Sequence, residues 1–254
     1  MKWKVAVSLL VAGLSLTAVL CRADSGVAST TQAQSARHLS DHHRVGQASA
    51  QPAASDSSSQ TQADNLPQLI RSMAYWIVVS HDHEGMSFII VDKVRAEVFL
   101  FDESGQFLDA SPALLGLARG DSLSPGMGLR KLSSIQPAER TTPAGRFAAS
   151  LDKNVHGDMV LWIDDDSGVA LHPVITSNPS ERRIERLASK TPDDNRITYG
   201  CINVDATFFE KIVVPRFLGT GGIVYILPEV SSIDQIFGSM AAEFVTRIES
   251  RAGQ

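Results

Sequence analysis

One cysteine and one histidine are the residues of this chain best suited to do chemistry. The chain has two cysteines, Cys21 and Cys201, and Cys21 falls in an apolar leader that is expected to be removed. Cys201 then remains alone, and in an oxidising compartment an unpaired cysteine is a liability unless its thiolate is used. A buried cysteine acting as a small apolar side chain is the alternative. The cysteine count alone leaves both interpretations open.

A cysteine nucleophile needs help, because only the thiolate attacks and a free thiol has a pKa of about 8.5. His172 lies at the end of a predicted strand and is the candidate base, since an imidazole can accept the thiol proton and later protonate a leaving amine. Gly200 directly precedes Cys201, and its lack of a Cβ permits a sharp turn and close approach of a carbonyl. The amides of Gly200 and Cys201 are then candidate donors to an oxyanion. Together these residues predict acyl transfer.

The elements that must position these residues are mainly short strands. Runs rich in β-branched and aromatic residues, separated by Gly, Pro, Asp and Ser, predict strands at 88–91, 97–101, 146–150, 159–163, 169–171 and 223–227. Helical signals predict helices over 66–79, 179–189, 205–214 and 233–251. The sequence therefore predicts a mainly β (α+β) domain with peripheral helices.

The first part of the chain has the composition of an export signal followed by a tether. Lys2 and Lys4 precede an apolar run and a small-residue stretch around Ala23, which predicts a Sec-type signal peptide over residues 1–23. A retained membrane anchor is the alternative. Residues 24–65 contain almost no large apolar side chains and predict a disordered tether rich in Ser, Ala and Gln. Residues 66–254 are long enough for one domain, which carries the N- and C-terminal helices.

The charge balance argues against nucleic acid as a partner. The chain carries 23 basic and 28 acidic residues, and the leader contributes basic residues only, so the remainder is more acidic still. No basic stripe is present in the sequence. The consecutive residues at 81–84, His-Asp-His-Glu, point in different directions and are expected to form a polar turn. We expect no metal, no other cofactor and a monomer.

Several ordered motifs resemble the L,D-transpeptidase catalytic domain (YkuD) family. The landmarks run from Thr142-Pro143-Ala144-Gly145 through Leu171-His172 to Tyr199-Gly200-Cys201-Ile202-Asn203, and the resemblance covers roughly residues 86–228. It implies a β-sandwich-like fold, a periplasmic or cell-envelope location, and a cysteine acyltransferase acting on peptidoglycan stem peptides. His172 matches the upstream histidine of the family. Asn203 and Thr198 match positions expected to support the loop.

Two departures from the family pattern leave the activity open. Tyr199 stands where most members carry a second histidine, and a phenol with a pKa of about 10 is a poor base. The 29 positions from His172 to Cys201 are also more than in most members, because a charged segment is inserted between them. The alternatives are an L,D-transpeptidase, a stem-peptide hydrolase such as an L,D-carboxypeptidase, and a catalytically weak or inactive peptidoglycan-binding protein.

Arginines on and near the inserted segment are candidates for binding a substrate carboxylate. A guanidinium binds a carboxylate through a bidentate fork, and stem peptides carry carboxylates. We consider Arg183, Arg186 and Arg196, and of these Arg196 is the candidate we favour. The alternative is a solvated helix in which Arg182 pairs with Glu185 and the other arginines are surface charges.

Overall fold

The structure of the protein is a computed structural model that describes residues 65–252. The predicted signal peptide over 1–23 and, apart from Asn65, the predicted tether over 24–65 lie outside the described residues. Within residues 65–252, none of the helices combines the length and the apolar character that a membrane span requires.

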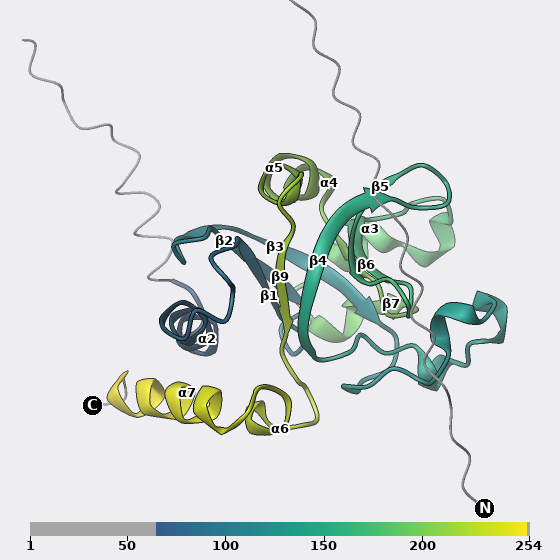
Figure 1. The fold of residues 1–254 in the computed structure, drawn as a ribbon. Coiled ribbons are helices and arrows are strands. Elements are labelled where there is room, and N and C mark those ends of the chain that lie inside the picture. Colours follow the sequence, from purple (N-terminus) through teal and green to yellow (C-terminus); the bar gives the residue numbers. More distant parts are fainter. Residues whose placement is uncertain (1–64, 253–254) are drawn as a thin grey trace, which may run out of the picture. The chain divides into compact units, whose positions relative to one another are not determined.

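Nine strands form one sheet in the described part of the chain (Figure 1). The strands are β1 (Phe88–Asp92), β2 (Glu97–Phe101), β3 (Phe107–Gly116), β4 (Gly145–Lys153), β5 (Met159–Asp164), β6 (Val169–Pro173), β7 (Arg196–Thr198), β8 (Ile202–Val204) and β9 (Gly222–Ile226). Their order is β2-β1-β9-β4-β5-β6-β8-β3-β7, and β2 also pairs with β3. The expected mainly β (α+β) class is confirmed. The β2–β3 pairing closes the sheet on itself, so the strands form a barrel-like layer.

Strand β1 shows how the alternation of side chains builds two cores. Ile89 and Val91 pack into the interior of the closed sheet, whereas Phe88 and Ile90 point to the opposite face. Successive side chains of a strand lie on opposite faces, so both sets are removed from water only if something covers the outer face. That cover is helix α2 (Gln68–Val79), which contributes Ile70, Met73 and Ile77 to the outer core.

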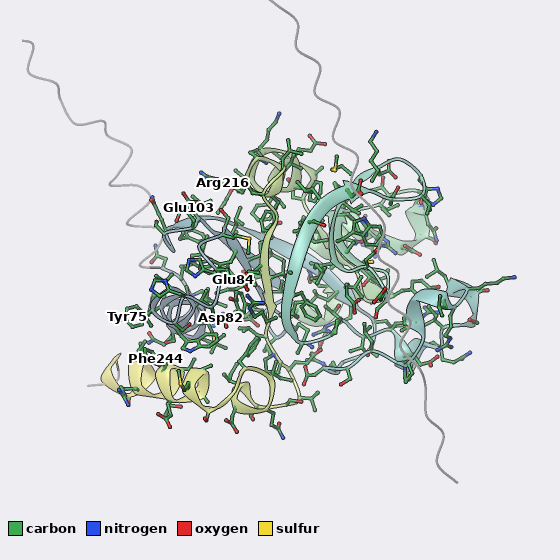
Figure 2. The ribbon with its side chains drawn as sticks, in the orientation of Figure 1. Tyr75, Asp82, Glu84, Glu103, Arg216 and Phe244 are labelled. Carbon is green, nitrogen blue, oxygen red and sulfur yellow. The ribbon has the colours of Figure 1, made fainter. Side chains whose placement is uncertain are left out.

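Helices surround the closed sheet, and one pair covers its outer core. The remaining helices are α3 (Arg183–Leu187), α4 (Ala206–Phe208), the π-helical turn η6 (Phe209–Val213), α5 (Val214–Phe217), α6 (Ile233–Phe237) and α7 (Ser239–Ala252). Short 3₁₀ turns are η1 (Met127–Leu129), η2 (Leu132–Ser134), η3 (Pro137–Glu139), η4 (Pro179–Glu181) and η5 (Pro192–Asn195). Tyr75 of α2 and Phe244 of α7 lie side by side, with ring centroids 6.2 Å apart (Figure 2). The expected peripheral helices are therefore present at both ends of the described residues.

Two helices expected to be continuous are interrupted, each at a residue with positive φ. The segment expected over 179–189 consists of η4 and α3 with Arg182 between them at φ 51°. The segment expected over 233–251 is divided at Gly238, which has φ 87°. Such a φ ends a right-handed helix, and it is common for glycine but unusual for arginine. Strands β3, β7 and β8 were not predicted.

Candidate active site

The register between β6 and β8 places the candidate nucleophile and base on one face of the sheet. The two strands pair in parallel, with Leu171 opposite Ile202 and His172 opposite Asn203. Leu171 and Ile202 belong to the interior core, so His172 and Asn203 face the other side. Cys201 precedes Ile202 and shares the outer face with Asn203, two positions away. The structure thus brings Cys201, His172 and Asn203 together on the outside of the barrel, beneath the inserted segment.

Cys201 is a free, partly exposed cysteine at the start of β8. Its Sγ lies 3.6 Å from the carbonyl oxygen of Gly168, on the turn between β5 and β6. Burial of the sulfur raises the pKa of the thiol, while the backbone amide of Ala170 and the charge of Arg183 lower it by less. The thiol is therefore protonated at neutral pH in this arrangement. Its proton must be removed before it can attack.

His172 is held by hydrogen bonds at both ring nitrogens. Its Nδ1 lies 2.9 Å from the carbonyl oxygen of Pro173, and its Nε2 lies 3.1 Å from Nδ2 of Asn203. Burial lowers the pKa of His172, the Pro173 carbonyl raises it, and the charge of Arg183 lowers it further. The ring is therefore a neutral base near pH 7. Within the described residues no hydrogen bond joins it to the Cys201 thiol.

Thr198 and Gly200 shape the loop that presents the cysteine. Thr198 Oγ1 accepts a hydrogen bond from the Gly200 amide at 3.1 Å and donates one to the Cys201 carbonyl at 2.6 Å. Gly200 has φ 137°, and a Cβ at this position would lie 2.9 Å from the carbonyl oxygen of Thr141. Only glycine fits here without strain. The Gly200 amide is already engaged, so of the two expected oxyanion donors the amide of Cys201 is the remaining candidate.

Thr142 connects the predicted Thr-Pro-Ala-Gly loop directly to the cysteine loop. Its hydroxyl donates to the Gly200 carbonyl and accepts from the Gly116 amide, both at 2.9 Å. Its own carbonyl accepts from Lys93 Nζ at 2.9 Å. The side chain is fully buried. Thr142 is thus part of the scaffold that positions Cys201.

Tyr199, the residue that departs from the family pattern, stacks against an arginine. The guanidinium carbon of Arg140 lies 4.1 Å from the centroid of the Tyr199 ring. A cation over an aromatic face is attracted by the ring's quadrupole. The ring therefore supports the loop through a contact that the sequence did not predict, because Arg140 lies far away in the chain.

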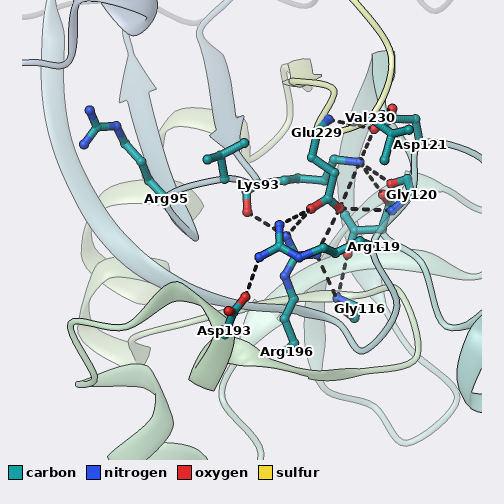
Figure 3. A network of polar contacts seen from close by, with 12 residues as sticks. Lys93, Arg95, Gly116, Arg119, Gly120, Asp121, Asp193, Arg196, Glu229 and Val230 are labelled. Carbon is teal, nitrogen blue, oxygen red and sulfur yellow. Dashed lines mark hydrogen bonds and ion pairs between the residues drawn. The ribbon is translucent and has the colours of Figure 1, made fainter.

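Arg196, the arginine favoured for binding a substrate carboxylate, is paired with an internal carboxylate in this structure. Arg196 is buried, and its guanidinium donates to both carboxylate oxygens of Glu229, at 2.6 and 3.1 Å, and to the Lys93 carbonyl at 2.7 Å (Figure 3). Arg119 also donates to Glu229, and Lys93 pairs with Asp121. The carboxylate of Glu229 therefore occupies the guanidinium donors that were expected to bind a substrate carboxylate. Arg196 therefore belongs to a buried network that ties strand β7 to the segment after β9.

The other two arginines differ in where their donors point. Arg183 donates from Nη1 to Asn203 Oδ1 at 2.8 Å, and its Nε pairs with Glu181. Arg186 donates to the carbonyl oxygens of Glu181 and Asp194 and so holds the inserted segment together. Of the three candidates, only Arg183 contacts a residue of the cysteine motif. Arg182 pairs with Glu185, as the alternative of a solvated helix predicted for these two residues.

A hollow of about 600 Å³ lies beside the imidazole. His172 and Pro173 form part of its wall, Phe209 and Val214 supply apolar surface, and Asp158 and Glu210 are its charged residues. Neither Cys201 nor Asn203 is among its lining residues. The hollow was not predicted, because its walls come from three separate segments of the chain.

Comparisons with known proteins give several structural neighbours of low similarity, among them the two that follow. Neither a family model nor a curated protein sequence matches the chain. The NMR structure of the catalytic domain of the E. faecium L,D-transpeptidase is 15% identical, covers 56% of this chain and 96% of that domain, and has a TM-score of 0.33. A variant of the helical cell shape determining protein Pgp2 from Campylobacter jejuni is 10% identical, covers 74% of this chain and 65% of that one, and has a TM-score of 0.38. Neither likeness decides what this chain does.

Proposed function

We propose that this protein is a cysteine acyltransferase of the L,D-transpeptidase type that acts on peptidoglycan stem peptides in the cell envelope. One observation carries the proposal: the three motif segments that are separate in the sequence meet around Cys201. Thr142 bonds to Gly200, and His172 and Cys201 share one face of the β6–β8 pair. A structural cysteine would have no need of a base on the same face or of a loop fixed from two sides.

The proposed reaction begins with transfer of the Cys201 proton to Nε2 of His172. The thiolate attacks the amide carbonyl between diaminopimelate and D-Ala of a tetrapeptide stem, and a carbon–sulfur bond forms. The amide of Cys201 is the candidate donor to the oxyanion. When the carbon–nitrogen bond breaks, His172 returns the proton to the departing amine of D-Ala, which leaves a thioester on Cys201.

The second half of the reaction reverses these roles with a different nucleophile. An acceptor amine attacks the thioester, His172 removes a proton from its nitrogen, and the new amide forms as the carbon–sulfur bond breaks. Cys201 leaves as a thiolate and regains the proton from His172. Attack by water gives a tripeptide instead, by the same proton transfers.

Product analysis tests this proposal and separates it from its alternatives. The full chain and a Cys201→Ala variant are incubated with disaccharide tetrapeptide, and the products are analysed by mass spectrometry. Cross-linked dimers with released D-Ala are expected for the wild type and absent for Cys201→Ala. Tripeptide alone would identify a hydrolase. Intact binding with neither product would identify a peptidoglycan-binding protein and contradict the proposal.

A further inference from the structure

A chain of hydrogen bonds runs from the inserted segment to the candidate base. Arg183 Nη1 donates to Asn203 Oδ1 at 2.8 Å, and Asn203 Nδ2 lies 3.1 Å from His172 Nε2. On the other side of the imidazole, Nδ1 lies 2.9 Å from the Pro173 carbonyl oxygen. Asn203 is 1% exposed, so water does not compete for its amide. Arg183, which the inserted segment supplies, is therefore connected to the reacting imidazole through one side chain.

The direction of each hydrogen bond follows from the chemistry of the groups. A guanidinium has donors only, so the Asn203 atom that faces Arg183 is its oxygen. The NH₂ group of Asn203 then faces His172 and requires an acceptor, which means that Nε2 carries no proton. The Pro173 carbonyl is an acceptor, so the proton of the neutral ring is on Nδ1. Arg183 thus selects one tautomer of His172.

This arrangement opposes the protonated imidazole that acyl transfer requires. If Nε2 took a proton from Cys201, its new N–H would face the NH₂ of Asn203, and two donors would meet. In the free protein the lone pair of Nε2 is already occupied by Asn203. The Asn203 amide must turn before His172 can act as an acid and base at full strength. The group that controls the amide is Arg183.

We propose that Arg183 is a carboxylate-dependent positioning residue that releases Asn203 when substrate binds. The inference rests on the proposed function. A substrate carboxylate that pairs with Arg183 draws the guanidinium from Asn203 Oδ1, and the freed amide turns away from His172 Nε2. The lone pair of Nε2 is then free to accept the proton that Cys201 gives up. Release of Nε2 is thereby coupled to occupancy of one subsite.

A carboxylate is the ligand chemistry that Arg183 fits. Only its Nε pairs with a carboxylate, that of Glu181, which is 34% exposed, and its Nη1 donates to the neutral amide of Asn203, which a carboxylate can replace. Arg196 is unsuitable because Glu229 fills its fork. The free side-chain carboxyl of diaminopimelate lies next to the bond to be cleaved and is the group we assign to this subsite.

The tautomer of His172 provides a test that does not depend on turnover. The full chain, labelled with ¹⁵N-histidine, is examined by long-range ¹H–¹⁵N NMR, and the His172 signal is identified by its loss in His172→Gln. We expect a proton on Nδ1 and a bare Nε2 in the wild type. Arg183→Met removes the donors and is expected to change this pattern. Arg182→Met, a neighbouring arginine paired with Glu185 away from the site, should not. A wild-type His172 protonated at Nε2 would overturn the proposal.

The carboxylate is tested with two tetrapeptides that differ in one group. In a Cys201→Ala chain, disaccharide tetrapeptide with a free diaminopimelate carboxyl is expected to shift the His172 ¹⁵N signals, and the same compound with a carboxamide is not. The charged groups around His172, namely Arg183 and the two acids Asp158 and Glu210 of the hollow, are unchanged between the two samples. Equal shifts with both compounds, or none with either, would overturn the proposal.

Acylation rates are a third test of the role of Arg183. They also distinguish failure of that role from failure of the proposed function. With Cys201 intact, the free-carboxyl compound should acylate roughly 10 to 100 times faster than the carboxamide, the range expected for a hydrogen-bonded charge. Arg183→Met should remove this preference, and Arg182→Met should keep it. A preference that survives in Arg183→Met would overturn the role of Arg183. If neither compound acylates the wild type, the proposed function fails, whereas the tautomer and the ligand-induced shifts still decide the inference.

Discussion

Arg196 and Arg183 make the same kind of ion pair in two different surroundings. Arg196 is 7% exposed and its fork is filled by Glu229, whose carboxylate also accepts from Arg119. Arg183 pairs with a carboxylate that is one-third exposed and uses another donor to hold Asn203 beside His172. The first arginine is closed to any further ligand. The second lies where a ligand can replace one of its partners.

This difference shows that burial and existing partners decide whether an arginine is available, because the residue type is the same. A buried ion pair holds one arrangement of the chain, and removing one partner leaves an unpaired charge away from water. An accessible pair contributes little to stability and can exchange partners. The buried network around Arg196 and Glu229 therefore holds the cysteine loop in place, and we call it the frame. We call Arg183 with its partners Glu181 and Asn203 the adjustable region.

The largest effect is expected when the buried pair is broken. Glu229→Gln leaves Arg196 and Lys93 without their common carboxylate in a buried region, and we expect a loss of about 3–5 kcal/mol in the free energy of unfolding. The matched change Glu181→Gln removes the partner of Arg183 and is expected to cost less than about 1 kcal/mol. Urea denaturation of both variants measures this contrast. Equal losses would show that the two pairs do not differ as described.

A smaller loss is expected where the frame meets the cysteine loop. Thr142→Val keeps the shape of the side chain but leaves the Gly200 carbonyl and the Gly116 amide without a partner, at a cost of about 1–3 kcal/mol. Acylation of Cys201 should slow as well, because the loop loses its anchor. Thr141→Val is the control, since no hydrogen bond of its hydroxyl is present among the described residues. Unchanged stability of Thr142→Val would remove Thr142 from the frame.

The position of Arg183 near His172 predicts how kcat/KM changes with pH. Burial and the charge of Arg183 lower the pKa of His172 below its ordinary value of 6.5. A base acts only when neutral, so kcat/KM should persist below pH 6.5 and be lost as the pH falls through the lowered pKa. Arg183→Met removes a positive charge and should move this acid limb to higher pH. A limb that stays in place in Arg183→Met, or that lies above pH 6.5 in the wild type, would contradict the assignment.

The smallest effect is expected at Tyr199, which belongs to neither arginine pair. Tyr199→Phe retains the ring beneath Arg140 and loses only the hydroxyl, so acylation should change less than about twofold. Tyr199→Ala removes the ring and is expected to cost about 0.5–1 kcal/mol of stability. A large loss of activity in Tyr199→Phe would give the phenol a role in the chemistry.

The sequence was sufficient to predict the class of fold and the strands with uninterrupted apolar runs. Strands such as β1 and β9 were predicted because both of their faces are buried and every residue is apolar or nearly so. Strand β3 was not, since its half-exposed stretch includes Asp109, Ser111 and Pro112, which are typical of loops. The breaks at Arg182 and Gly238 depend on single backbone angles that helical spacing does not reveal.

For the candidate site, the sequence identified the residues but not their partners. Cys201, His172, Thr198, Gly200 and Asn203 were named from motif and chemistry, and the register of β6 and β8 brings them together. The pairing of Arg196 with Glu229 was not predicted, because Glu229 lies 33 positions further along the chain. Contacts of this kind follow from how the barrel closes, and one sequence carries no record of that.

The central claim, that Cys201 is an acyl-accepting nucleophile, is tested most directly by the intact mass of the protein. The full chain is mixed with disaccharide tetrapeptide that bears a free diaminopimelate carboxyl, quenched rapidly in acid, and measured by mass spectrometry, with the adduct located by peptide mapping. We expect one acyl group per chain, on Cys201, formed as D-Ala is released, and none in Cys201→Ala. An unmodified wild-type protein that nevertheless binds the peptide, or an adduct that persists in Cys201→Ala, would contradict it.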